Sequence, residues 1–219
     1  MKKTSLIFDL DGTLLDTIGD LTDSTNYALE KFGFPKRTID EVRSFVGNGL
    51  KMLIFRALPA GTDDATIEAV LRQMKMHYTE NYHNKTIPYS GIPELLARLR
   101  GDGYTMAIVS NKADSVVSLL RTLYFDGLIP VAVGETEQIS RKPAPDMVWE
   151  GLRRLGTQRD SAVYIGDSEV DIRTADNAGL PCLSVSWGFR TAQQLQAAGA
   201  RQIVHSPQEL YTVISSRYE

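Results

Sequence analysis

From Pro88 to the end of the chain, short apolar runs alternate with segments of helical pattern, and this alternation constrains the fold more than any other feature. Strands that alternate with helices of this length form parallel sheets with helices on both faces. One more apolar run lies near the N-terminus. The sequence therefore predicts an α/β fold, a Rossmann-like parallel sheet flanked by helices. The expected strands are residues 5–9, 105–109, 131–133, 162–165, 182–185 and 203–204.

The segment between the first strand and Pro88 carries only helical patterns. Thr38 and Glu41 have the spacing of a capping box, in which each side chain accepts a hydrogen bond from the backbone N–H of the other residue. Apolar residues at helical spacing predict a longer helix over residues 63–84. We therefore expect a small all-α domain inserted after the first strand. The predicted domains are an α/β core, residues 1–15 and 88–219, and a helical domain, residues 16–87.

The charge and the single cysteine narrow the class of protein. The net charge is −3 and the isoelectric point about 5.7, so no overall positive field attracts nucleic acid or an anionic membrane. Cys182 cannot form an internal disulfide, which fits a reducing compartment. Asp9 interrupts the first apolar run, which is too short for a signal peptide. We expect a cytoplasmic protein with no membrane partner.

Polar and charged residues follow the expected strands where these end. In open parallel sheets, ligands bind beyond the carboxyl ends of the strands. Four loops would therefore bring four carboxylates, a hydroxyl and an ammonium group to one edge of the sheet. The residues concerned are Asp9, Asp11, Ser110, Asn111, Lys112, Lys142, Asp167 and Asp171.

Four neighbouring carboxylates repel one another, and a divalent cation would remove the conflict. Carboxylate and carbonyl oxygens, without histidine or cysteine, suit Mg²⁺, which also commonly binds a substrate phosphate. Lys142 and Ser110 could donate to the remaining phosphate oxygens. The set therefore indicates a Mg²⁺ cofactor and an aspartyl-phosphate intermediate.

At these residues the sequence resembles the haloacid dehalogenase-like hydrolase superfamily, and the four motifs occur in the family's order. The weaker resemblance of residues 46–50 (VGNGL) and 56–58 (RAL) is to its phosphoglycolate phosphatase subgroup. The resemblance implies a phosphatase of a small phosphorylated metabolite, with 2-phosphoglycolate as the expected substrate. The four motifs are residues 9–17 (DLDGTLLDT), 110–112 (SNK), 142–143 (KP) and 166–171 (GDSEVD).

The resemblance also implies roles for the acids. Asp9 would attack phosphorus and hold Mg²⁺ through its other oxygen. Asp11 would protonate the leaving oxygen, then activate water, and would bind the metal through its backbone carbonyl. The family's dehalogenase branch lacks this second aspartate, so Asp11 favours phosphoryl chemistry. Asp167 would be the third metal ligand, with Asp171 beside the metal in its outer shell.

The remaining implied roles concern binding. Ser110, Asn111 and Lys142 would hold the phosphoryl oxygens. The helical domain would act as a cap that closes over the site and contacts the substrate. Candidate substrate contacts in that domain are Gly47, Asn48 and Arg56.

Other functions remain open at this stage. A phosphosugar mutase similar to β-phosphoglucomutase would share Asp9 and Asp11, and a pyrophosphatase of the same superfamily is a further alternative. A phospho-aspartate signalling domain also joins acids, Mg²⁺ and a lysine on a parallel sheet, but it needs no helical insert. The sequence leaves the oligomeric state open, as a monomer or a homodimer.

Overall fold

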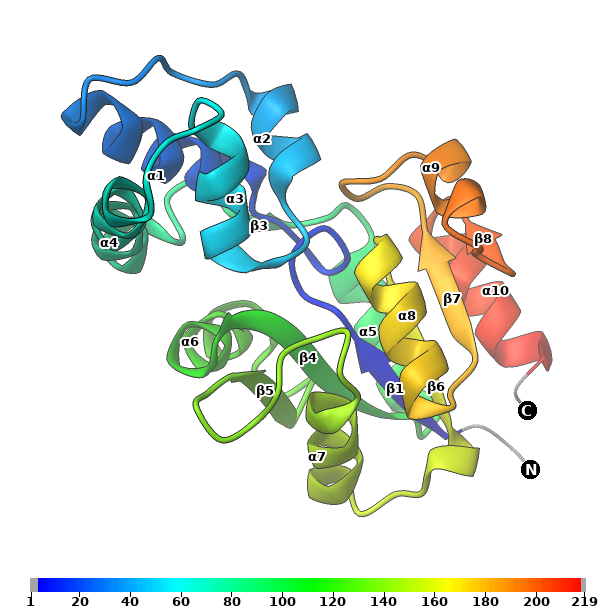
Figure 1. Ribbon diagram of the computed structural model, residues 1–219. Helices are drawn as coiled ribbons and strands as arrows, with labels where there is room; N and C mark the ends of the chain where they lie inside the picture. The colour runs from blue at the N-terminus through cyan, green and yellow to red at the C-terminus, as the bar shows by residue number, and fades with distance from the viewer. Residues whose placement is uncertain (1–3, 218–219) are drawn as a thin grey trace. The chain divides into compact units, whose positions relative to one another are not determined.

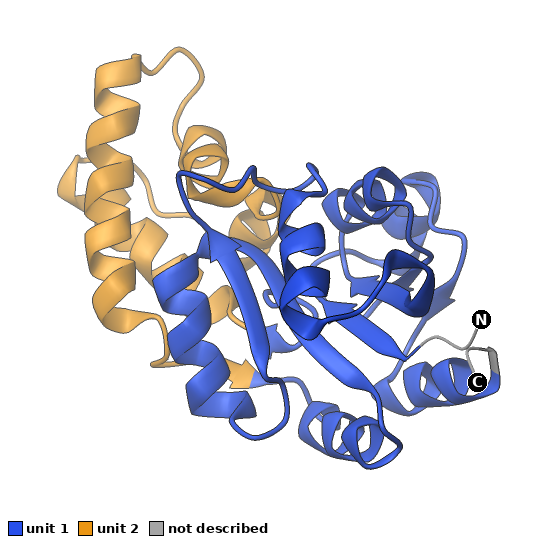
Figure 2. Cartoon of the chain, turned by 90° about the horizontal axis from the view of Figure 1, so that it is seen from below, with its two compact units in different colours: residues 1–15, 88–219 blue, residues 16–87 orange. Residues whose placement is uncertain are grey.

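The structure is a computed structural model that describes residues 4–217. The chain divides into two compact units, shown in Figure 2. One contains Met1–Leu15 and Pro88–Glu219, and we call it the α/β unit. The other contains Asp16–Ile87, and we call it the helical unit.

The helical unit is built from four helices (Figure 1). The capping box that the sequence predicts is present, because Glu41 N–H donates to Thr38 Oγ1 at 3.3 Å and Thr38 N–H donates to Glu41 Oε2 at 2.7 Å. Apolar side chains such as Leu29, Leu53 and Met74 are fully buried between the helices. The helices are α1 (Ile18–Lys31), α2 (Ile39–Phe45), α3 (Gly49–Ala57) and α4 (Asp64–Asn81).

The α/β unit contains a six-stranded sheet in the order β5-β4-β1-β6-β7-β8, with the strands parallel in every described pairing. This confirms the predicted fold class. A second sheet pairs β2 (Leu15–Asp16) with β3 (Ile87–Pro88), which the sequence does not predict. The six strands are β1 (Ser5–Phe8), β4 (Thr105–Ala113), β5 (Val131–Glu135), β6 (Ala162–Gly166), β7 (Cys182–Val185) and β8 (Ile203–Val204).

Helices cover the sheet and bury its apolar strands. Helix α7 contacts α8, and α5 contacts α10. Every residue of β1 and of β6 is buried, as expected for strands covered on both faces. The helices are α5 (Ile92–Gly101), α6 (Asp114–Phe125), α7 (Asp146–Leu155), α8 (Glu169–Ala178), α9 (Ala192–Ala197) and α10 (Pro207–Arg217), with a 3₁₀ turn at Arg159–Ser161.

The order of the strands in the sheet predicts where a ligand would bind. From β1 the chain continues to β4 and β5 on one side of the sheet, then returns to place β6, β7 and β8 on the other side. The order of strands therefore reverses between β1 and β6. Ligands in open α/β sheets bind at such a point, outside the carboxyl ends of the strands.

Strand β4 is longer than the sequence predicts. It was expected to end at Val109, with Ser110 in a loop, but the strand continues to Ala113 with a register shift in between. The neighbouring Gly134 allows this extension, because a Cβ there would lie 2.6 Å from the Asp114 nitrogen. Its backbone N–H also donates to the Asp114 side chain at 2.8 Å. Residues 110–113, whose polar sequence is typical of a loop, therefore belong to β4 and are held there by β5.

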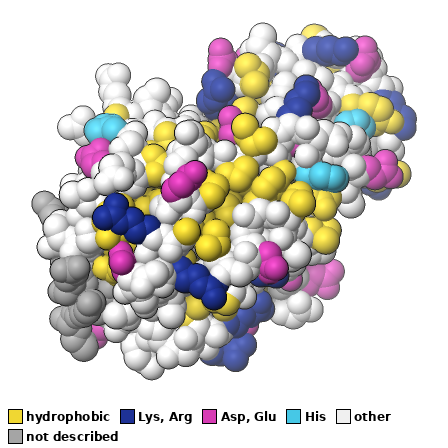
Figure 3. All heavy atoms as spheres, turned by 180° about the vertical axis from the view of Figure 1, so that it is seen from behind, with side chains coloured by type: hydrophobic (Ala, Val, Ile, Leu, Met, Phe, Trp, Pro, Cys, Tyr) yellow, Lys and Arg dark blue, Asp and Glu magenta, His cyan; other side chains and the backbone are white. Residues whose placement is uncertain are grey.

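Some large apolar side chains reach the surface in both units. Leu119 and Leu123 on α6, Trp149 on α7 and Phe55 on α3 are each more than half exposed. Figure 3 shows one face on which apolar side chains lie among charged ones. Across the described residues, no helix combines the length and the apolar character that a membrane span requires.

Candidate active site

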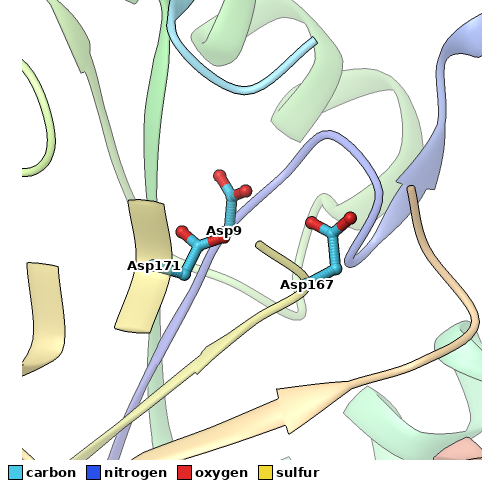
Figure 4. Close-up of side chains that lie close together, drawn as sticks. All are labelled: Asp9, Asp167 and Asp171. Carbon is cyan, nitrogen blue, oxygen red and sulfur yellow. The ribbon is translucent and has the colours of Figure 1, made fainter. Parts of the chain in front are cut away.

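Three buried carboxylates meet at the strand-order reversal. Asp9 follows β1, Asp167 follows β6, and Asp171 lies in the first turn of α8. Each offers an oxygen, and these oxygens lie within 4.8 Å of one another. Figure 4 shows the three side chains facing the same space. The pairing of β1 with β6 accounts for this, since Phe8 aligns with Ile165 and the next residues lead directly into Asp9 and Asp167.

Lys142 joins two of these acids. Its ammonium lies 2.7 Å from Asp9 Oδ1 and 2.8 Å from Asp171 Oδ1, and it is almost fully buried. It also donates to the Tyr164 hydroxyl at 3.1 Å. The lysine therefore sits between the two acids, with its charge directed at Asp9.

Asp171 is held from both sides. Its Oδ1 accepts hydrogen bonds from Lys142 and from the Tyr164 hydroxyl, the latter at 2.9 Å. Its Oδ2 accepts from Ser168 N–H at 3.1 Å and from Ser168 Oγ at 2.6 Å. The first of these bonds and the bond from Asp171 N–H to Ser168 Oγ, at 3.4 Å, form a capping box at the start of α8. Both oxygens are thus engaged by protein donors. This arrangement favours the outer-shell role that the sequence suggests for Asp171.

Asp167 is less heavily engaged. Thr13 Oγ1 donates to its Oδ1 at 3.3 Å, and the Phe189 backbone N–H donates to its Oδ2 at 2.7 Å. Each carboxylate oxygen keeps a lone pair for a further ligand. Gly12 has a φ of +89° and packs against this carboxylate, where a Cβ would clash. The glycine of the first motif thus lets the loop after β1 approach Asp167.

Asp11 pairs with a second lysine. Lys112 Nζ lies 3.0 Å from Asp11 Oδ1, and the side chain of Lys112 is only 6% exposed. The sequence places Lys112 in a motif but assigns it no role. Lys112 lies in the extension of β4, the strand that pairs with β1, and Asp11 lies in the loop that follows β1.

The two remaining phosphate-binding candidates contact Lys142 and Lys112. Asn111 binds the backbone of Lys142, with Lys142 N–H donating to Asn111 Oδ1 at 2.7 Å and Asn111 Nδ2 donating to the Lys142 carbonyl at 3.0 Å. Ser110 is buried and accepts from Lys112 N–H at 3.3 Å. Asn111 thus positions Lys142 in this structure, and direct phosphate contacts of Asn111 and Ser110 stay predictions.

The charge balance of the cluster favours a cation. When all are ionised, four aspartates and two lysines leave two negative charges in a largely buried site. Burial, with the Asp171 carboxylate nearby, raises the pKa of Asp9 from its ordinary 3.8 to about 7. Burial and the same neighbour raise the pKa of Asp167. Burial alone would lower the pKa of Lys142, but Asp171 and Asp9 raise it above its usual range. A divalent cation bound by oxygen ligands would balance the charge, so the residues fit Mg²⁺.

Several residues of the site carry no strong sequence signal. Tyr164 lies in a fully buried strand, where it resembles an ordinary core residue. The loop after β7 also contributes, since Trp187 Nε1 donates to the Thr13 carbonyl at 3.0 Å and Phe189 binds Asp167. The sequence signal for this loop is its position after another strand of the same sheet, because ligands bind beyond the carboxyl ends of such strands.

The remaining candidates lie in the helical unit. Asn48 is the residue before α3, Gly47 precedes it with a φ of +127°, and Arg56 lies in the last turn of α3. The Arg56 guanidinium donates to the Phe45 carbonyl at 2.7 Å. This contact gives Arg56 a structural role within the unit, and a substrate contact for any of the three stays a prediction.

Comparison with known proteins agrees with this geometry. Residues 6–185 match the family model described as haloacid dehalogenase-like hydrolase. A phosphoglycolate phosphatase of Mesorhizobium japonicum is 36% identical over 86% of this chain and 85% of its own length. One from Rhodobacter capsulatus is 35% identical, over 85% of each chain.

A solved structure shows the same relationship in three dimensions. It is that of a protein assigned as a phosphoglycolate phosphatase from Lactobacillus delbrueckii subsp. bulgaricus. Its TM-score is 0.94 at 37% identity, covering 98% of this chain and 99% of that one. The chain belongs to the haloacid dehalogenase-like hydrolase family, in the subgroup that resembles phosphoglycolate phosphatases, and is an enzyme of the phosphatase class.

Proposed function

We propose that the enzyme hydrolyses a small phosphorylated metabolite, with 2-phosphoglycolate as the leading substrate, and that Asp9 accepts the phosphoryl group. The observation that carries this proposal is the convergence of Asp9, Lys142 and Asp167 at the strand-order reversal. The names of the relatives support the substrate.

The residues of the site would divide the chemistry among them. Asp9 attacks phosphorus, and the ester oxygen leaves as the new bond forms. Asp11 protonates that oxygen and later takes a proton from the water that releases phosphate from Asp9. Lys142 places a positive charge beside Asp9, where the phosphoryl oxygens would gather, while Ser110 offers a hydroxyl donor.

Mg²⁺ would be held by Asp9, Asp167 and the backbone carbonyl of Asp11. When bound, it would neutralise charge on the phosphoryl oxygens. Asp171 would stay outside the ligand set and hold Lys142. The helical unit would serve as a cap, with Gly47, Asn48 and Arg56 as candidate contacts to the substrate.

A phosphate-release screen tests the proposal. The panel contains 2-phosphoglycolate, other phosphorylated acids, sugar phosphates, nucleoside monophosphates and pyrophosphate, each with and without Mg²⁺. We expect Mg²⁺-dependent release with 2-phosphoglycolate preferred, and loss of turnover in Asp9→Asn. A fully active Asp9→Asn variant would refute the covalent route. Isomerised sugar phosphate without net release would instead indicate a mutase, and long-lived phosphoprotein without turnover a signalling domain.

A further inference from the structure

The Tyr164 hydroxyl occupies a central place in the buried network. Tyr164 lies in β6, between Val163 and Ile165, and its side chain is fully buried. Its ring packs in the apolar cluster that contains Ile7 and Val148, while its hydroxyl reaches Lys142 at 3.1 Å and Asp171 at 2.9 Å. A buried phenol is usually hydrogen-bonded, but contact with two charged groups of a catalytic centre exceeds what packing requires.

The contacts of Lys142 explain what the hydroxyl contributes. An ammonium group has three N–H donors. In this structure Lys142 has three acceptors, namely Asp9 Oδ1, Asp171 Oδ1 and the Tyr164 oxygen. These acceptors fix both the position and the rotation of the ammonium. The Tyr164 oxygen is the uncharged one of the three and the most distant.

The hydroxyl also secures Asp171. Burial, reinforced by the Asp171 charge, raises the pKa of Tyr164 well above its usual range, so the phenol stays protonated and donates to Asp171 Oδ1. Ser168 holds the other oxygen of Asp171. Loss of the Tyr164 hydroxyl would therefore loosen Lys142 directly, and also through Asp171.

We infer that Tyr164 is a positioning residue that holds Lys142 and Asp171 in line with Asp9 for phosphoryl transfer. The inference rests on the proposed function, because the position of the Lys142 ammonium affects activity only if Asp9 receives a phosphoryl group. It assigns a role to a side chain in a strand whose other residues serve as core.

The test is Tyr164→Phe, which removes the hydroxyl and keeps the ring. We expect kcat to fall about 10-fold, as for one hydrogen bond to a charged group, with KM changed less than about 3-fold. The control is Tyr104→Phe, since Tyr104 is also a buried tyrosine but lies just before β4, at the opposite end of the sheet. It should leave kcat unchanged.

A double-mutant cycle separates positioning from stability. Because the hydroxyl acts on Lys142 both directly and through Asp171, adding Tyr164→Phe to Asp171→Asn should cost less activity than Tyr164→Phe costs in the wild type, since the part that acts through Asp171 is already lost. Independent, multiplying losses would overturn the inference, and so would a Tyr164→Phe enzyme whose kcat lies within 2-fold of the wild type.

A measurement without substrate keeps this test separate from the proposed function. In the nitrogen-15 spectrum, the Lys142 ammonium signal should shift in Tyr164→Phe and not in Tyr104→Phe. In the wild type, Lys142 ammonium protons should show a nuclear Overhauser effect to the Tyr164 hydroxyl proton. This measurement does not depend on the folding of any variant. Absence of that effect would overturn the inference even in an active phosphatase. Its presence in a protein that releases no phosphate would show that Tyr164 holds Lys142 and would refute the proposed function, and with it the link to phosphoryl transfer.

Discussion

Phe189 and Asp167 are joined by a 2.7 Å hydrogen bond from the backbone N–H of the first to Oδ2 of the second. Phe189 belongs to the loop after β7, and Asp167 follows β6, so two neighbouring strands deliver the pair to the same edge. The bond holds one oxygen of the proposed metal ligand. The loop after β7 is therefore part of the site through this backbone donor, and the positive charge of its Arg190 also acts on Asp167.

Gly188→Ala should disrupt this contact. A Cβ on Gly188 would lie 2.5 Å from Asp167 Oδ2 and would also clash with the Gly12 carbonyl. We expect phosphatase activity to fall at least about 100-fold, the cost of displacing groups by about 1 Å, and half-maximal activity to need more Mg²⁺. Steady-state kinetics over a Mg²⁺ titration measure both effects.

The matched control for this prediction is Gly101→Ala. Gly101 is the last residue of α5, and a Cβ there would meet nothing within 4 Å. Alanine is favoured over glycine in helices by up to about 1 kcal/mol, so this variant should be active and at least as stable as the wild type. An active Gly188→Ala enzyme with normal Mg²⁺ demand would show that the tight packing is not needed.

Asp167 and Asp171 should respond differently to metal. Added Mg²⁺ should raise Tm of the wild type, because an ion that binds only the folded state stabilises it. Asp167→Asn should abolish most of this rise, since Asp167 oxygens keep lone pairs for the ion. Asp171→Asn should keep most of it, because both Asp171 oxygens are engaged by Lys142, Tyr164 and Ser168. Thermal unfolding with EDTA or Mg²⁺ measures the rise, and the opposite order would make Asp171 the ligand.

Asp9 should make the metal-free protein less stable as pH rises. Its pKa is about 7 in the folded protein and near 3.8 ordinarily, so between these values the folded state holds more protons than the unfolded chain. The free energy of unfolding therefore falls as pH rises through this window. Asp9→Asn cannot ionise, so in EDTA it should be more stable than the wild type at pH 8 and similar to it near pH 4.

Thermal unfolding at both pH values tests this. Asp126→Asn is the control, since Asp126 is exposed and lies far from β1 in the sequence, and it should change neither value appreciably. An Asp9→Asn protein less stable than the wild type at pH 8 in EDTA would contradict the expected sign.

The parts of the site that the sequence reveals are those fixed by local pattern and strand order. Asp9 and Asp167 each follow an apolar run directly, and parallel strands bring such positions together whatever the other details. The pattern also predicts a helix that begins near Asp171, and in the structure Asp171 lies in the first turn of α8, where it forms a capping box with Ser168. The alternation of strands and helices predicts the α/β class for the same reason.

The parts that the sequence hides depend on contacts between distant segments. Tyr164 has the pattern of a core residue, and only the arrival of Lys142 from another loop gives its hydroxyl a partner. Gly188 is one glycine among 17, and its importance follows from the proximity of the Gly12 carbonyl. The extension of β4 beyond Val109 depends on Gly134 in the neighbouring strand.

Replacing Lys112 should lower activity most for substrates whose leaving group needs a proton. Its ammonium lies 3.0 Å from Asp11 Oδ1 and orients the group that would protonate the departing oxygen. The value of kcat/KM reports the steps up to departure of the leaving group. We expect Lys112→Met to lower kcat/KM about 10-fold or more for an alkyl phosphate such as 2-phosphoglycolate. For p-nitrophenyl phosphate, whose phenolate leaves without a proton, the loss should stay below about 3-fold. Lys36→Met, at an exposed lysine, should change neither value. Equal losses on the two substrates would show that Lys112 does not act through Asp11 as a proton donor.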